Sequence, residues 1–316
     1  MARMRAVSCE GGELSLVDLP DPEPGPGQLV LRVRRTGICD SDLHARRHAD
    51  ELAAVMDELD YAHSIRSTEP TVLGHELCGE VVAQGRGTAR SFPLGSRVVA
   101  FPLVRGTEGV HPVGLSPLAP GGYAEQVLVE ASMSHRVPDA LDDDLAALTE
   151  PMAVALHAVN RSEITRRDVA IVVGCGPVGL AVICHLKARG VQTIVASDFS
   201  PGRRALASRC GAHVVVDPAA GSPYEAVPAN RRGMTALPEL YELGMGAMEK
   251  LRRVPGWSHV YRVADRLGGT APKRPVVFEC VGVPGMIDGI VGAAPLASRV
   301  VVVGVCMGDD KLRPAM

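Results

Sequence analysis

The side chains most capable of chemistry in this sequence are a thiol, a hydroxyl, imidazoles and carboxylates in three short segments of the first half of the chain. They are Cys39, Ser41 and His44 in the first segment, His75 and Glu76 in the second, and Glu150 in the third. Cysteine thiolate, histidine nitrogen and carboxylate oxygen are common zinc ligands, and a catalytic zinc keeps one position open. A single histidine is more often structural and an acidic residue more often solvated. The residues by themselves therefore leave open both a zinc site and an ordinary surface.

A glycine-rich segment matches the spacing of a dinucleotide-binding turn. Gly174, Gly176 and Gly179 follow the pattern G-x-G-x-x-G, with Pro177 and Val178 between the last two glycines. The pattern follows an apolar strand predicted at 168–174 and opens a helix predicted at 177–189, which is the context the motif requires. The glycines permit a tight turn, close approach of a pyrophosphate and close helix–sheet packing. The helix N-terminus favours the bound anion.

Asp198 stands at the end of the next predicted strand and bears on the choice of cofactor. An acid at that place accepts hydrogen bonds from the ribose hydroxyls and repels a 2′-phosphate, which favours NAD over NADP. Arg203 and Arg204 follow closely and weaken this preference. The alternative interpretation is a structural strand–helix–strand unit with a solvated aspartate.

Two kinds of element must position these groups. Up to about residue 155, short strands such as 13–19 and 28–34 alternate with Pro- and Gly-rich turns, which predicts a small β-rich unit, interrupted by a surface helix at 45–64. From residue 167, strands and helices alternate, which predicts a parallel sheet with helices on both faces. The segment 221–269 is long for a connection in such a sheet, and 237–253 within it is predicted to be an inserted helix.

The composition is that of a globular protein and excludes several functions. The 316 residues are 46% hydrophobic and carry a formal net charge of −3, which disfavours nucleic-acid binding. No apolar run approaches about 18 residues, so no membrane span is expected, and Met1–Glu10 lacks the apolar region of a signal peptide. Eight scattered cysteines without a Cys-x-x-Cys pair are typical of reduced thiols in a cytoplasmic protein.

Taken together, these segments resemble the zinc-containing medium-chain dehydrogenase/reductase superfamily, most closely its sorbitol, butanediol and threonine dehydrogenase branch. The matching segments occur in family order over nearly the whole chain. They are 37–44, GHELCGE at 74–80, PLGSRVV at 93–99, GGYAEQV at 121–127, EPMAVALHAV at 150–159, GCGPVGL at 174–180 and FECVG at 278–282.

The resemblance implies an α/β protein with two domains and an active site between them. An N-terminal GroES-like, β-rich catalytic domain is expected at 1–155. A Rossmann-like, doubly wound parallel-sheet domain that binds NAD is expected at 156–316. The implied activity is zinc-dependent hydride transfer between NAD and a secondary alcohol, a polyol or an amino alcohol, with the small-molecule substrate unidentified. A homo-oligomer is also implied.

The resemblance assigns roles to the residues singled out above. It implies that Cys39 and His75 bind the catalytic zinc and that Glu76 and Glu150 occupy the acidic positions, one or both of which ligate the metal. Ser41 and His44 are expected to relay the proton. Arg203 is expected to contact the adenosine ribose beside Asp198.

Three features depart from the family pattern. Residues 101–120, which correspond to a lobe with four zinc-binding cysteines in many members, contain no cysteine, so one catalytic zinc and no structural zinc are expected. The segment 221–269 exceeds the family connection by roughly one helix. The family continues well beyond Gly304, whereas this sequence stops at Met316, so the second domain is expected to be C-terminally incomplete and to lack the strand that usually forms the dimer seam, either as a genuine truncation or because the sequence is incomplete.

Two other functions remain to be weighed. One is a zinc-free quinone or enone reductase of the same superfamily, whose members lack the Cys/His/Glu set. The other is a truncated, non-catalytic NAD-binding protein. Fold analogy does not decide between them; the presence of Cys39, Ser41, His44, His75 and Glu150 together favours the zinc enzyme.

Overall fold

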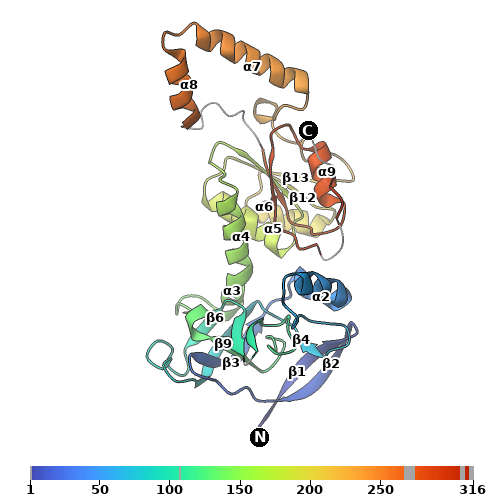
Figure 1. The fold of residues 1–316 in the computed structure, drawn as a ribbon, viewed down its shortest axis with the longest axis vertical. Coiled ribbons are helices and arrows are strands. Elements are labelled where there is room, and N and C mark those ends of the chain that lie inside the picture. The colour runs from blue at the N-terminus through green and yellow to red at the C-terminus, as the bar shows by residue number, and fades with distance from the viewer. Residues whose placement is uncertain (1, 107, 267–274, 307–309, 313–316) are drawn as a thin grey trace. The chain divides into compact units, whose positions relative to one another are not determined.

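The structure is a computed structural model that describes residues 2–106, 108–266, 275–306 and 310–312. The chain forms two compact units, Met1–Ala153 and Val154–Met316 (Figure 1). No helix in the described ranges is both long enough and apolar enough to cross a membrane.

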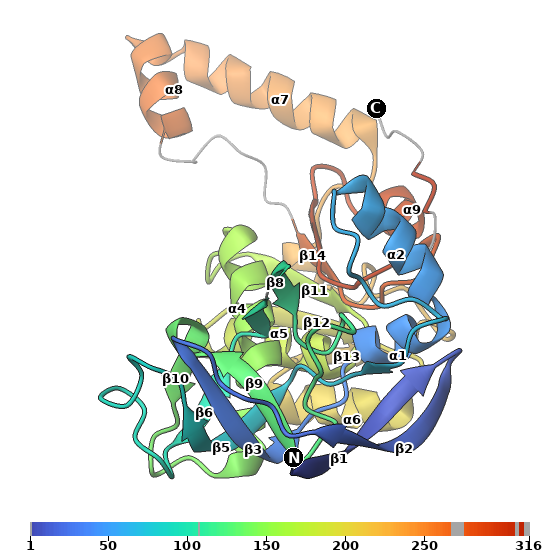
Figure 2. The ribbon, with the colours of Figure 1, turned by 60° about the horizontal axis from the view of Figure 1, so that its bottom comes forward.

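The first unit is built from antiparallel strands. One sheet has the order β2-β1-β4, a second has the order β10-β6-β5-β3-β9, and β7 pairs with β8 as a hairpin. Figure 2 shows the strands of the second sheet side by side. Their bounds are β1 Arg3–Glu10, β2 Glu13–Pro20, β3 Gln28–Thr36, β4 Thr71–Val72, β5 Leu77–Gln84, β6 Arg97–Ala100, β7 Leu103–Gly106, β8 Gly109–Pro112, β9 Gln126–Glu130 and β10 Ser134–Arg136.

The core of this unit lies between strands whose alternate residues are apolar. Leu29 and Leu31 of β3 pack with Val81 of β5, Val98 of β6 and Val127 of β9, and all are nearly inaccessible to water. Period-two alternation places these side chains on one face of the sheet, as the sequence predicts for a half-buried strand.

Two short helices replace the single helix predicted at 45–64. Helix α1 spans Asp40–Arg47 and α2 spans Ala49–Glu58. They are separated at His48, whose backbone angles of φ −131° and ψ 38° are not helical. The first helix therefore begins five residues earlier than predicted, directly after Cys39, so its first turn lies at the candidate metal site.

The second unit contains a parallel sheet of order β13-β12-β11-β14-β15. The chain enters at the central strand, runs outward to one side and returns to the other, which is the predicted doubly wound arrangement and is confirmed here. Ala170, Ile171 and Val172 of β11 are all fully buried, so this strand is covered on both faces. The bounds are β11 Val169–Val173, β12 Thr193–Ser197, β13 Val214–Val216, β14 Val276–Glu279 and β15 Arg299–Val302.

Helices pack against this sheet, and a further pair of helices lies in the long segment between β13 and β14. Helix α5 packs on β11 and β12, α6 on β12 and β13, and α9 on β15. The segment between β13 and β14 contains α7 and α8; the sequence predicts only the first of these helices, and residues 267–274 lie outside the described ranges. The bounds are α3 Asp143–Ala147, α4 Thr149–Arg161, α5 Pro177–Ala188, α6 Pro201–Cys210, α7 Leu237–Arg252, α8 Trp257–Arg266 and α9 Met286–Ala293, with short 3-10 turns at Ala131–Met133 and Ala229–Arg231.

Candidate functional site

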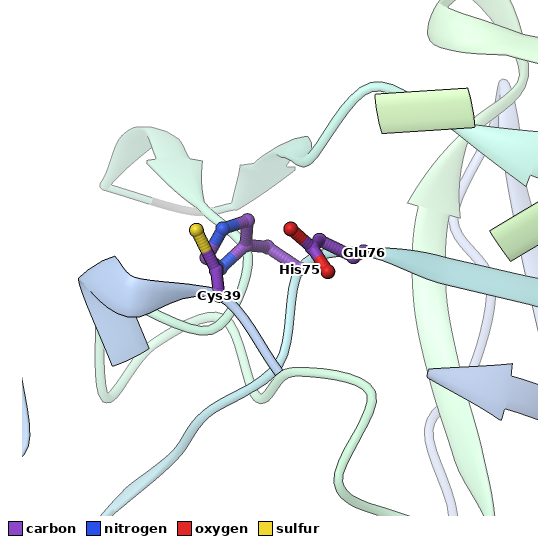
Figure 3. Close-up of side chains that lie close together, drawn as sticks. All are labelled: Cys39, His75 and Glu76. Carbon is purple, nitrogen blue, oxygen red and sulfur yellow. The ribbon is translucent and has the colours of Figure 1, made fainter. Parts of the chain in front are cut away.

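The first unit brings Cys39, His75 and Glu76 together. One ligand atom of each, the sulfur, a ring nitrogen and a carboxylate oxygen, lies within 4.8 Å of the other two (Figure 3). Cys39 is the residue before α1, and His75 and Glu76 stand immediately before β5. His75 is 7% exposed and Glu76 is 3% exposed, so both polar side chains are buried at this point.

Gly37 provides the space that the Glu76 carboxylate occupies. Its N–H donates to the Glu76 carbonyl oxygen at 2.7 Å, which joins the segments that carry Cys39 and Glu76. A Cβ at Gly37 would overlap Glu76 Oε2 and lie 3.1 Å from Glu76 Cβ. A glycine at this position therefore allows the carboxylate to point toward the other two ligand atoms.

Asp42, which the sequence analysis did not single out, anchors both ligand segments. Its carboxylate accepts a hydrogen bond from the Cys39 N–H at 3.0 Å and from the Gly74 N–H at 3.3 Å. Its Oδ1 also lies 3.3 Å from His75 Nδ1. A signal for it exists in the sequence, because an acidic residue at the third helical position commonly reaches back to the N-terminal N–H.

The charges at the site favour a cation. Burial lowers the pKa of His75, but its contacts with Asp42 and Cys39 outweigh burial and raise the pKa to about 10. Burial opposes ionisation of Asp42, yet the same contact with His75 holds the pKa of its carboxyl below the ordinary value. Burial raises the pKa of the Glu76 carboxyl.

The residues present fit a zinc ion. Sulfur, nitrogen and oxygen donors are the set that zinc takes in catalytic sites. Glu76 Oε1 is buried and has no hydrogen-bond partner among the described residues, which is costly for a carboxylate oxygen unless a cation satisfies it. His75 Nδ1 lies 3.3 Å from Asp42 Oδ1, at ion-pair distance without a formed hydrogen bond, which places a carboxylate where metal-bound histidines commonly have one.

The other predicted site residues of this unit lie on α1 and in the first turn of α4. Ser41 Oγ is 3.3 Å from His75 Nε2. His44 follows Ser41 by three residues on α1, hence on the same side of the helix, and is half-buried. Glu150, in the first turn of α4, is not among the three residues whose ligand atoms converge. Burial raises the pKa of the Glu150 carboxyl, which the charge of His75 lowers in part.

In the second unit, the turn after β11 has the backbone that the glycine pattern requires. Gly174 has φ +90°, and a Cβ there would lie 2.7 Å from a methyl of Val281. A Cβ at Gly179 would overlap the Gly174 carbonyl oxygen, so helix α5 could not approach the strand as it does. Gly176 precedes α5 and Pro177 occupies its first turn, with Val178 next. The free N–H groups of this helix start are suited to a phosphate.

Asp198 stands beside this turn at the end of β12. Its Oδ2 accepts a hydrogen bond from the Cys175 N–H at 2.8 Å, and its Oδ1 accepts one from the Ser200 N–H at 2.7 Å. Arg203 Nη1 lies 3.9 Å from Oδ2, and the Arg203 side chain is half exposed. The carboxylate is thus held against the glycine-rich turn, with an arginine next to it.

Known proteins are similar to this chain in sequence and fold. Residues 25–139 match the alcohol dehydrogenase GroES-like domain family. (R,R)-butanediol dehydrogenase of Bacillus subtilis (strain 168) is 30% identical over 311 residues, which cover 96% of this chain and 77% of that protein. Sorbitol dehydrogenase of Gallus gallus is 30% identical over 293 residues, covering 89% and 77%.

Among solved structures, a protein of Sinorhizobium meliloti 1021 assigned as a zinc-binding dehydrogenase, with NADP bound, superimposes with a TM-score of 0.73. It is 27% identical, and the match covers 100% of this chain and 80% of that one. The 2R,3R-butanediol dehydrogenase of Bacillus subtilis superimposes with a TM-score of 0.67 at 29% identity, covering 98% and 80%.

Proposed function

This chain belongs to the zinc-containing medium-chain dehydrogenase/reductase superfamily, and we propose that it transfers a hydride between a secondary alcohol, a polyol or an amino alcohol and NAD. Alcohol-dehydrogenase-type oxidoreduction is the activity of its relatives. The observation that carries the proposal is the convergence of Cys39, His75 and Glu76, with the Glu76 oxygen buried and unpartnered.

The site residues would have different roles in such a reaction. Cys39, His75 and Glu76 would hold one zinc, and Glu150 supplies a further carboxylate nearby. Bound zinc supplies Lewis-acid catalysis, which lowers the pKa of a substrate hydroxyl. Asp42 orients the His75 ring and fixes the Cys39 backbone.

Two residues of α1 are placed to remove the proton of the substrate hydroxyl. The Ser41 hydroxyl lies next to His75 Nε2 and can accept the proton of a substrate hydroxyl at this place. His44, one turn further along the same helix and half-buried, can pass that proton toward solvent. The hydride acceptor is the nicotinamide of the cofactor, whose chemistry is its own.

The cofactor preference rests on Asp198. Its carboxylate lies beside the glycine-rich turn, where it can accept the ribose hydroxyls and repel a 2′-phosphate. Arg203 on the same side favours a phosphate and argues for the opposite preference. We place NAD first because the carboxylate is held in position by two backbone N–H groups.

The test is metal content together with turnover. The purified protein should contain one zinc per chain and oxidise at least one member of a panel of secondary alcohols, sugar alcohols and amino alcohols, with higher kcat/KM for NAD than for NADP. Cys39→Ser should remove zinc and turnover together. An active, zinc-free Cys39→Ser protein would instead support a quinone or enone reductase. The homo-oligomer and the cytoplasmic location stay predictions.

A further inference from the structure

Tyr123 is a half-buried tyrosine that joins the two ligand-bearing segments from a third segment of the chain. It lies between β8 and β9, far in sequence from both Cys39 and His75. Its hydroxyl oxygen is 2.9 Å from Asp42 Oδ2 and 3.2 Å from the carbonyl oxygen of Gly37. With one proton to give, the hydroxyl donates to the carboxylate, which is the shorter and the charged contact.

The Leu73–Gly74 backbone packs against Tyr123. Its N–H donates to the Leu73 carbonyl oxygen at 3.0 Å, next to the His75 segment. Gly74 has φ +97°, and a Cβ at Gly74 would lie 2.7 Å from the ring. The ring therefore fits only because residue 74 has no side chain, and it lies against the backbone that leads into His75.

The hydroxyl completes the set of donors to Asp42. This carboxylate is 2% exposed, so water cannot satisfy it. Its two oxygens face the Cys39 N–H and Tyr123 hydroxyl on one side and the Gly74 N–H and His75 Nδ1 on the other. Removal of the Tyr123 hydroxyl would leave Oδ2 with the Cys39 N–H as its single donor and would weaken the hold on the orientation of this buried carboxylate.

We propose that Tyr123 is a positioning residue for the metal site, which acts through Asp42 to hold the His75 ring and the Cys39 backbone in ligating geometry. The inference rests on the proposed zinc site. It assigns a role to a tyrosine that touches none of the three ligand atoms itself. A tyrosine that merely filled space would be replaced by phenylalanine without effect on the metal.

The test compares Tyr123→Phe with the unmodified protein and with Tyr61→Phe. Tyr61 is a matched control, because its hydroxyl also lies within hydrogen-bond distance of a buried histidine, 3.0 Å from His111 Nδ1, away from the ligand group. Zinc affinity is measured by competition with a chromogenic chelator. The absorption bands of the cobalt(II)-substituted proteins report ligand geometry without any substrate.

Tyr123→Phe should bind zinc about 10-fold more weakly, the lower end of the effect of losing a group that supports a metal ligand. Its cobalt bands should shift, whereas Tyr61→Phe should match the unmodified protein in both readouts. Unchanged affinity and bands in Tyr123→Phe would overturn the inference and leave the zinc site standing. If the unmodified protein binds no zinc, or if Cys39→Ser binds it as tightly, the proposed function itself fails.

Discussion

Replacement of Gly37 by alanine should weaken zinc binding more than it weakens the fold. The added Cβ would overlap Glu76 Oε2 and lie 3.2 Å from Glu76 Cδ. The φ angle of Gly37 is not in the left-handed region, so alanine can adopt the backbone. The conflict is therefore with the Glu76 side chain, whose carboxylate must leave its place beside Cys39 and His75 and whose Cβ comes into close contact with the added methyl.

The size of the effect follows from the kind of contact. An extra methyl in a packed interior costs about 1–3 kcal/mol. If Glu76 relieves the overlap by rotating away, that cost appears as lost zinc affinity, and about 1.4 kcal/mol corresponds to a factor of about 10. Zinc should bind roughly 5- to 150-fold more weakly. The unfolding temperature of the metal-free protein should change little, since the backbone and the Gly37 N–H bond to Glu76 are kept.

Chelator competition and thermal unfolding of the metal-free protein measure the two quantities separately. Gly221→Ala is the matched control, because a Cβ at Gly221 meets nothing within 4 Å and its φ is not in the left-handed region. Gly37→Ala combined with Glu76→Asp should recover part of the affinity, because the shorter side chain avoids the added methyl. Equal zinc affinity in Gly37→Ala and the unmodified protein would refute the assignment of Glu76 as a ligand.

Three further outcomes are expected. Asp42→Asn should weaken zinc binding by about 10- to 100-fold in the same competition assay, because the His75 ring loses a charged partner; unchanged binding would contradict that role. Contacts with Asp42 and Cys39 raise the pKa of His75 to about 10, so zinc that binds below that pH must displace the proton of this ring. Zinc affinity should therefore rise with pH, and protons should be released in a weakly buffered titration. Binding without proton release would show that His75 is not a ligand. Asp198→Ala should lower kcat/KM for NAD more than for NADP. Asp198→Asn is the control that removes the charge but keeps an oxygen able to accept a hydrogen bond from the Cys175 or Ser200 N–H. An equal loss for both cofactors would contradict the preference for NAD.

The sequence predicts those parts of the structure that local patterns determine. The glycine-rich turn and the carboxylate beside it are predictable because strand, turn, helix and acid follow one another within one supersecondary unit. The buried strands of the parallel sheet are predictable because both faces are covered, so their residues are continuously apolar.

The arrangement of the metal site is less predictable because it depends on contacts between distant segments. Cys39 and His75 can be picked out by residue type, but their approach depends on the pairing of β3 with β5. Asp42 and Tyr123 are 81 residues apart in the sequence and come together only in the folded first unit, so the sequence near either residue does not predict their contact. The break between α1 and α2 at His48 is not predictable either, because the apolar residues that indicate the helix, Leu52, Val55, Met56 and Leu59, all follow it.

Helix α8 carries Trp257, the only tryptophan of the chain. The Arg252 guanidinium lies 5.7 Å from the centre of its ring, so the indole reports on the junction between α7 and α8. Intrinsic fluorescence excited at the tryptophan band is thus a probe of the surroundings of α7 and α8. A change in that emission when the oxidised nucleotide is added, which does not absorb tryptophan emission, would reveal a response of these two helices, whereas occupancy of the glycine-rich turn is better followed through the emission of the reduced nicotinamide itself.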